Sequence, residues 1–353
     1  MDVRSESAII DALARVAPGT DLREALDNII SADTGALIVI GDVQRATALC
    51  DGGFTLDIPF TPQRLFELAK MDGAIMLDDD CRTILRANVH LVPDASLATH
   101  ETGMRHRTAE RVSRQTGSLV ISVSQRRNVV SLYRSGIKVT LEDVTVVLAK
   151  ANQALQTLQR YRQRLDEVMA RLTILEFEEA ATVGDVVSAV QRSELVQRVG
   201  REVARYVTEL GSEGRLVAMQ AEEVTAQVGE DHSLLVRDYV VDGGTRHASL
   251  VRFMLSDMTQ DQVLDGVAVA QALGFPATAD VLEYHVQPRG YRVLRRIPAL
   301  PAAVVNRLVE RFATLSSLVA ASEAALDDVD GVGARRARAI RDGLRRLRGQ
   351  TGS

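Results

Sequence analysis

The heptapeptide GALIVIG, residues 35–41, decides how the first part of this chain folds. Its five apolar residues, three of them β-branched, lie between two glycines, a pattern typical of a short strand that is buried on both faces. The stretches before it, SAIIDALARVAPG (7–19) and TDLREALDNII (20–30), space their apolar residues as amphipathic helices do. A buried strand preceded by helices predicts a layered α/β domain.

Further strands are expected after this one. Apolar and β-branched runs bounded by turn-forming residues predict strands at 54–60, 73–78, 83–92, 118–124 and 128–136. Helical patterns lie between some of them, at 61–71 and 108–116. We therefore predict an N-terminal α/β domain over 1–145, with a central mixed sheet flanked by helices.

The distribution of proline separates the rest of the chain from this domain, because no proline occurs between Pro93 and Pro276. Within that interval an apolar seam with spacings of three, four or seven residues predicts one long helix. The seam consists of Leu148, Ala151, Leu155, Leu158, Leu165, Val168, Leu172 and Leu175. We predict an all-α middle domain over 146–285, which packs on its own domain or on another subunit.

Composition narrows the class of protein. Of 353 residues 46% are hydrophobic and 25% charged, which is ordinary for a globular protein, and the length suggests more than one domain. No apolar run approaches the roughly 18 residues that span a bilayer, and no signal peptide pattern is present, so we expect a cytoplasmic protein without a membrane partner. Cys50 and Cys81 form neither a metal motif nor a disulfide framework. The isolated His232 and His247 are expected at the surface or as helix caps.

The segment from residue 286 onward reverses the charge of the chain. It contains 13 arginines, no lysine and 6 acidic residues, whereas the whole chain has a formal net charge of -5. Such asymmetry is typical of a nucleic-acid-binding segment on an acidic body, and arginine suits bidentate phosphate contacts. Exclusive use of arginine is also what a GC-rich genome produces.

Within this segment VDGVG (329–333) suggests how a phosphate could be bound. Two glycines let a helical hairpin turn tightly, and the backbone N–H groups of the following helix start can hold a phosphate. The pattern resembles a helix-hairpin-helix motif, with PALP (298–301) as the hairpin of a degenerate partner. We predict an all-α DNA-binding domain over 286–353 that reads the shape of the DNA backbone. Its predicted contact residues are Gly331, Val332, Gly333, Arg335, Arg336 and Arg338. The alternative is a glycine-capped hairpin used for protein contacts.

Two short motifs in the α/β domain carry candidate chemistry. Arg105, His106 and Arg107 stand in a row, and adjacent residues share one target only from a loop or the first turn of a helix. Their target would be anionic and larger than one carboxylate; the alternative is a solvated charged turn. Asp72 and Gly73 precede a strand, where the carboxylate either binds Mg²⁺ or caps a turn.

These motifs gain specificity together. TGALIVIG (34–41), DGA (72–74), RANVHLVPD (86–94), RHRTAERVSRQTG (105–117) and SLVISVSQRRN (118–128) resemble the diadenylate cyclase domain in order and spacing. With the helical middle and the hairpin tail, the whole chain resembles the DNA-integrity scanning diadenylate cyclases, the DisA family.

The resemblance implies a role for each motif residue. Asp72 would be the catalytic carboxylate and would bind Mg²⁺, or Mn²⁺, between the α-phosphate of ATP and the attacking ribose 3′-hydroxyl. Leu91 would pack near the adenine, and Ser124 would face the phosphates. The full set implied to bind ATP is Gly73, Ala74, Leu91, Met104, Arg105, His106, Arg107, Thr108 and Ser124. Members of the family often have threonine where this chain has Met104, a difference that removes a possible side-chain hydroxyl contact and keeps the backbone N–H.

The implied reaction converts two ATP into cyclic di-AMP and two pyrophosphates. Each ATP gives its 3′-hydroxyl to the other's α-phosphate, so two domains must face each other in a symmetric oligomer. The resemblance implies an octamer, association with the nucleoid, and branched or damaged DNA as a partner that lowers synthesis. Two alternatives stay open: a DNA-repair accessory protein whose α/β domain binds nucleotide without cyclase activity, and a structural protein that oligomerises through its helical region.

Overall fold

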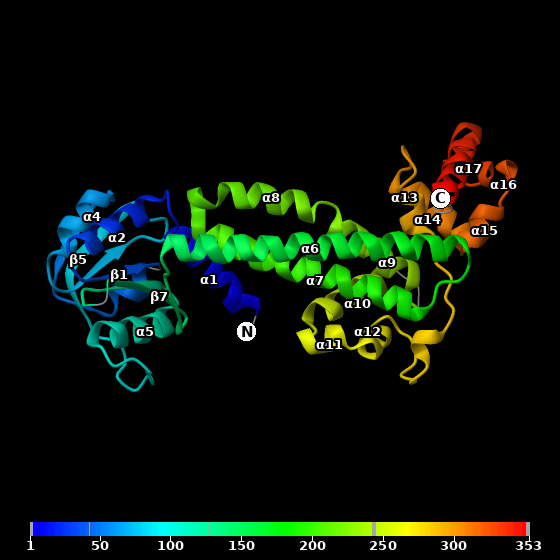
Figure 1. Cartoon of the computed structure of the whole chain (residues 1–353). Coiled ribbons are helices and arrows are strands. Elements are labelled where there is room, and N and C mark those ends of the chain that lie inside the picture. The colour runs from blue at the N-terminus through cyan, green and yellow to red at the C-terminus, as the bar shows by residue number, and fades with distance from the viewer. Residues whose placement is uncertain (1–2, 42, 127, 242–244, 351–353) are drawn as a thin grey trace. The chain divides into compact units, whose positions relative to one another are not determined.

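The computed structural model describes residues 3–41, 43–126, 128–241 and 245–350. Within them an α/β region is followed by helices as far as residue 350 (Figure 1). This confirms the predicted fold class. By compactness the chain divides into two units, Met1–Gln153 with Val203–Met219, and Ala154–Glu202 with Gln220–Ser353. The domain boundaries after residues 145 and 285 stay predictions.

One mixed sheet lies in the first unit. Among the described residues its strands are β1 (Ala36–Ile40), β2 (Cys50–Asp51), β3 (Phe54–Pro59), β4 (Ala74–Leu77), β5 (Thr83–Leu91), β6 (Leu119–Ser124), β7 (Val129–Arg134) and β8 (Ile137–Thr140). Their order is β2-β5-β4-β1-β6-β7-β8, and β3 pairs with β5. Strands β1 and β4 are parallel, whereas the other pairs are antiparallel. The strand within GALIVIG is therefore central, and β2 and β8 lie outside the predicted strands.

Helices cover both faces of this sheet, which explains why both faces of β1 are apolar. Ile38 and Ile40 pack in one core with α1 (Val3–Arg15), α2 (Asp21–Ser31) and α4 (Pro62–Ala69). Leu37 and Val39 point to the opposite face and pack with α3 (Val43–Thr47) and α5 (Met104–Thr116). The alternation follows from the two-residue period of a strand.

The middle of the chain is helical. Its elements are α6 (Val144–Phe177), α7 (Val183–Leu210), the 3₁₀ turn Gly211–Gly214, α8 (Arg215–Thr225), α9 (Val228–Tyr239), α10 (Thr245–Asp257), α11 (Gln260–Leu264), α12 (Gly266–Ala272) and the 3₁₀ turn Val281–Glu283. The predicted seam lies on the single helix α6. Its fully buried members are Ala151, Leu155, Leu158, Leu165 and Leu172, and the other three are half-buried.

The prediction for His232 was wrong. Its side chain on α9 is only 2% exposed, and Nε2 lies 3.1 Å from Oε1 of Glu194, which is also buried, on α7. His247 is half-buried on α10. The prediction rested on the absence of other ligand-type residues near His232 in the sequence. Sequence neighbours do not show whether a histidine packs against a carboxylate from another helix.

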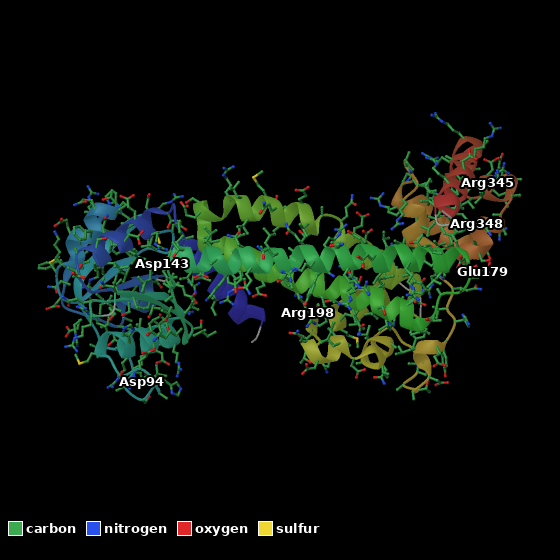
Figure 2. All side chains as sticks on the ribbon, in the orientation of Figure 1. Asp94, Asp143, Glu179, Arg198, Arg345 and Arg348 are labelled. Carbon is green, nitrogen blue, oxygen red and sulfur yellow. The ribbon has the colours of Figure 1, made fainter. Side chains whose placement is uncertain are left out.

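The chain continues with five short or medium helices: α13 (Tyr291–Arg295), α14 (Ala302–Phe312), α15 (Leu315–Ala320), α16 (Glu323–Asp327) and α17 (Gly333–Gln350). The segment PALP joins α13 to α14, and VDGVG joins α16 to α17. Ala337 and Ile340 of α17 are buried, whereas Arg345 on the same helix is exposed (Figure 2). Throughout the described ranges, every helix is too short or too polar to cross a bilayer.

Candidate functional site

Several of the predicted site residues of the α/β domain lie at one edge of the sheet. The parallel strands β1 and β4 both begin there, so Asp72 and Gly73 lie at this edge immediately before β4. The antiparallel neighbours β5 and β6 end at the same edge, with Leu91 and Ser124 as their last residues. The sheet order thus brings together residues that are far apart in the sequence.

Arg105 connects α5 to this edge. Its Nη2 lies 3.7 Å from Oδ1 of Asp72, whose side chain is fully exposed. The same guanidinium lies against Gly35, where a β-carbon would come within 2.0 Å of Nη1 and 3.2 Å of the carbonyl oxygen of Val123. The structure therefore brings one residue of each motif, a carboxylate and a guanidinium, to the same point.

The motif residues 105–107 occupy the first turn of α5. Gly103 precedes the helix without a capping side chain, and the first turn holds no acidic residue. A helix start of this kind offers backbone N–H donors and partial positive charge to an anion. The side chain of Met104 is 84% exposed, and Met104 contributes its backbone N–H to this helix start. Thr108, which follows this first turn, is half-buried.

The three motif side chains take different directions. Arg105 reaches the sheet edge, as described above. Nδ1 of His106 lies 2.9 Å from the hydroxyl of Tyr133, and Nε of Arg107 donates to the carbonyl of Glu101 at 3.4 Å. The structure brings Arg105 to Asp72 and does not bring His106 or Arg107 there.

The other predicted residues have clear structural positions. Gly73 has a φ of +95°, and a β-carbon there would come within 2.8 Å of the backbone of Asn88, so the fold itself requires this glycine. Ala74 and Leu91 are buried in the apolar layer under α5. Ser124 is half-buried at the end of β6. Their contacts with a nucleotide stay predictions.

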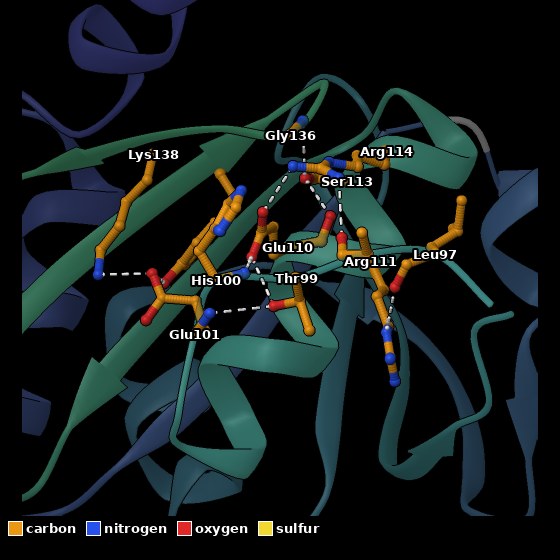
Figure 3. Close-up of polar contacts among 12 residues, drawn as sticks. Leu97, Thr99, His100, Glu101, Glu110, Arg111, Ser113, Arg114, Gly136 and Lys138 are labelled. Atoms are coloured by element: carbon orange, nitrogen blue, oxygen red, sulfur yellow. Dashed lines mark hydrogen bonds and ion pairs between the residues drawn. The ribbon is translucent and has the colours of Figure 1, made fainter. Parts of the chain in front are cut away.

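A buried carboxylate, which sequence reasoning missed, holds the loop between β5 and α5. Glu110 is 5% exposed and accepts hydrogen bonds from Oγ1 of Thr99 at 2.6 Å and from the backbone N–H of His100 at 3.2 Å (Figure 3). Arg114 pairs with its other oxygen at 2.7 Å, and Arg111 and Arg114 donate to loop carbonyls. These contacts fix the segment that leads into the first turn of α5.

A second set of polar contacts ends on His106. Lys138 of β8 lies 2.7 Å from Oε1 of Glu101, and the hydroxyl of Tyr133 on β7 donates to the same oxygen at 3.0 Å. Burial raises the pKa of Glu101, but the hydrogen bonds from Lys138 and Tyr133 lower it, and the net pKa is below its ordinary value. Burial, with the hydrogen bond to Glu101, raises the pKa of Tyr133 well above its ordinary value.

The hairpin between α16 and α17 has the predicted turn. Gly331 and Gly333 have φ values of +79° and +63°, in the left-handed region that favours glycine, and Val332 between them is buried. Arg307 of α14 donates from Nη1 to the carbonyl of Asp330 at 2.8 Å and lies 2.8 Å from its carboxylate. A residue of the degenerate partner motif thus holds this hairpin.

The predicted basic residues of α17 differ in their surroundings. Arg335 is exposed, Arg336 donates to the carbonyl of Gly331, and Nε of Arg338 lies 3.7 Å from the carboxylate of Glu323. Of these three arginines, Arg336 therefore stabilises the hairpin itself through its hydrogen bond to Gly331.

Two family models match this chain. One is described as the DisA bacterial checkpoint controller nucleotide-binding region and covers residues 23–138; the other is the DisA checkpoint controller linker region, over residues 141–282. The DNA integrity scanning protein DisA of Symbiobacterium thermophilum is 52% identical over 348 residues, which cover 99% of this chain and 98% of that protein. The chain belongs to the DisA family. This confirms the resemblance inferred from the sequence.

Other DisA proteins extend over the chain in the same way. Those of Carboxydothermus hydrogenoformans and Streptomyces avermitilis are each 48% identical; they match 98% and 95% of this chain and 98% and 91% of their own lengths. The residues matched to the nucleotide-binding family model include strands β1 to β7 and α5, and therefore both Asp72 and Arg105.

Proposed function

We propose that this chain is a diadenylate cyclase, a nucleotidyltransferase that condenses two ATP into cyclic di-AMP and two pyrophosphates. The observation that carries the proposal is the meeting of Asp72 and Arg105 at the sheet edge, beside an α-helix start without a side-chain cap. A carboxylate for a metal and a cationic helix start for phosphates are what one metal–ATP complex needs. Membership of the DisA family supports the same chemistry.

A divalent metal at this edge would have few ligands from the protein. The described ranges contain no group of three or more His, Cys, Asp or Glu side chains placed to hold a metal. Mg²⁺, however, typically uses one or two carboxylates together with substrate phosphates and water, and the exposed Asp72 can supply one. We propose that Asp72 holds Mg²⁺ or Mn²⁺, which when bound neutralises phosphate charge and lowers the pKa of the 3′-hydroxyl.

The groups of the chain itself would position the nucleotide. The N–H groups at the start of α5, together with the charges of Arg105 and Arg107, would bind the triphosphate. The start of α5 and Asp72 would together hold one ATP in each chain, yet the reaction needs two ATP that attack each other. Two copies of the domain must therefore face each other, and we propose a homo-oligomer, an octamer in its full form.

We further propose that the hairpin 329–333 and the start of α17 bind the backbone of branched or damaged double-stranded DNA, at the nucleoid, and that this lowers cyclase activity. The left-handed glycine turn and the arginines of this segment support it, as does the name DNA integrity scanning protein of its relatives. Cyclase rates that stay unchanged at a saturating four-way junction would contradict the regulatory part.

Product analysis tests the cyclase proposal. The purified chain is incubated with ATP and Mg²⁺ or Mn²⁺ beside the Asp72→Asn variant, and the nucleotides are separated and weighed by mass spectrometry. A product with the mass of cyclic di-AMP that the variant does not make would support the proposal. A folded protein that binds ATP and forms no product with either metal would instead indicate a nucleotide-binding accessory protein.

A further inference from the structure

The side chain of His106 ends a chain of polar contacts that includes residues from three other segments. Its Nδ1 lies 2.9 Å from the hydroxyl of Tyr133 on β7, and that hydroxyl lies 3.0 Å from Oε1 of Glu101 in the loop before α5. Lys138 on β8 binds the same carboxylate oxygen at 2.7 Å. We call His106, Tyr133, Glu101 and Lys138 the histidine relay. It is separate from the contact between Arg105 and Asp72.

The direction of the hydrogen bonds in the relay follows from Glu101. The ionised Glu101 carboxylate only accepts hydrogen bonds, so the single hydroxyl proton of Tyr133 points to it. The oxygen of Tyr133 must then accept from His106, which requires a proton on Nδ1. The relay therefore selects the Nδ1–H form of the ring and leaves Nε2 as the nitrogen whose protonation can change.

The position of the ring suits a ligand at the helix start. Cδ2, the ring carbon bonded to Nε2, lies close enough to Gly103 that a β-carbon there would come within 3.4 Å of it. This edge of the imidazole thus lies next to the residue that caps α5. Glu101 attracts a positive charge on His106, and the negative charge of a bound polyphosphate would do the same.

We propose that Glu101 and Tyr133 are positioning residues that fix His106 as the Nδ1–H form, so that Nε2–H of the imidazolium donates to a phosphate of ATP. The proposal rests on the proposed function. It explains why a buried tyrosine reaches the first turn of α5 with its hydroxyl rather than only its ring. A ring fixed before the ligand arrives spends no binding free energy on ordering.

The competing explanation is structural, because the same residues also anchor the loop before α5. Two variants separate the two roles. Tyr133→Phe removes only the hydroxyl and keeps the fully buried ring among Val120, Ala109 and Val112. Glu110→Gln weakens the other anchor of the same loop and leaves every atom of the relay in place. A loop effect would appear in both variants, whereas an effect on the tautomer would appear only in the first.

The first measurement is nitrogen NMR of the ligand-free full chain with ¹⁵N-labelled histidine, assigned with His106→Asn. We expect a protonated Nδ1 for His106, a changed Nδ1 signal in Tyr133→Phe and Glu101→Gln, and an unchanged signal in Glu110→Gln. An Nε2–H form in the wild type, or a signal that Tyr133→Phe leaves unaltered, would overturn the relay. This readout does not depend on cyclase activity.

The second measurement is the affinity for ATP with Mg²⁺, by equilibrium dialysis. Tyr133→Phe and Glu101→Gln are expected to weaken binding about tenfold, the size of one lost charge-assisted hydrogen bond, and to have no further effect in the His106→Asn background. Unchanged affinity with an altered NMR signal would refute donation to the phosphate. A wild type that does not bind ATP would refute the proposed function and, with it, the role of Nε2, while the NMR result on the relay would still stand.

Discussion

Gly35→Ala is expected to impair the proposed active site without unfolding the domain. A β-carbon at this position would lie 2.0 Å from Nη1 of Arg105, whereas ordinary contacts begin at about 3.4 Å. The guanidinium must therefore move by more than 1 Å from the position in which it lies 3.7 Å from Asp72. The second contact, 3.2 Å to the carbonyl of Val123, needs a shift of only a few tenths of an ångström.

The magnitude follows from this displacement. A misplacement of about 1 Å in a group that positions substrate costs about 10²-fold in kcat/KM, equivalent to about 2.7 kcal/mol of transition-state stabilisation. The free energy of unfolding should change by less than about 1 kcal/mol, because the displaced atoms are the end of a flexible side chain and alanine restricts the unfolded chain more than glycine does.

Cyclase kinetics and urea unfolding, measured on the same preparations, test this reasoning. Gly229→Ala is a matched control, because a β-carbon there would meet nothing within 4 Å. If Gly35 acts only through Arg105, Gly35→Ala should have no further effect in an Arg105→Ala background. Full kcat/KM in Gly35→Ala, or an equal further loss in the double variant, would refute the reasoning.

Three further predictions concern the fold and the tail. Gly73→Ala should lower the free energy of unfolding by at least about 2 kcal/mol in urea titrations, because its φ is +95° and a β-carbon would approach the backbone of β5 to 2.8 Å; stability equal to wild type would contradict this. Arg292→Met should lower local stability by about 3–5 kcal/mol, because it leaves the buried Glu176 without its ion-pair partner. Hydrogen exchange of residues 286–350 should accelerate, and an unchanged exchange rate would contradict this loss of stability. Arg307→Ala should weaken binding to double-stranded DNA by about tenfold for any sequence in fluorescence anisotropy, because the hairpin loses a donor to its carbonyl, whereas the exposed Arg311→Ala should have a smaller effect; equal losses would count against a positioning role.

Local patterns predicted most of the sheet but not its order. The apolar runs around β1, β4 and β6 were each sufficient to identify a strand, because a strand buried on both faces must be apolar throughout. The pairing of β1 with β4 on one side and β6 on the other depends on contacts between distant segments, which no local pattern contains. The strands that were missed, β2 and β8, are short and only partly buried, so they lack that apolar signal.

The site was predictable where several motifs occur together. Asp72 and residues 105–107 stood out because their order and spacing together resemble one known domain, whereas each motif alone is also compatible with a solvated turn. The contact between Asp72 and Arg105 could not be predicted from their separation in the sequence, because it depends on the parallel pairing of β1 and β4. Tyr133 and Glu110 gave no signal, since one lies in an apolar strand and the other in a charged helical pattern typical of an exposed face. Their importance comes from burial, which a single sequence does not display.

The structure also changes what the charge of the tail means. Composition counts 13 arginines from residue 286 onward, yet several of them serve the fold. Arg289 donates to the carbonyls of Arg237, Asp238 and Val240, and Arg292 is 1% exposed. The arginines exposed on α17 are Arg335, Arg336, Arg338, Arg345, Arg346 and Arg348. Each neutralised phosphate contributes about −0.9 to the slope of log K against log salt, so this helix supports a slope of about −5 at most, where thirteen contacts would give about −12. The arginine count of the whole tail therefore overstates what α17 alone can contribute by about a factor of two, and exposed arginines outside this helix, such as Arg311, would have to supply any steeper slope.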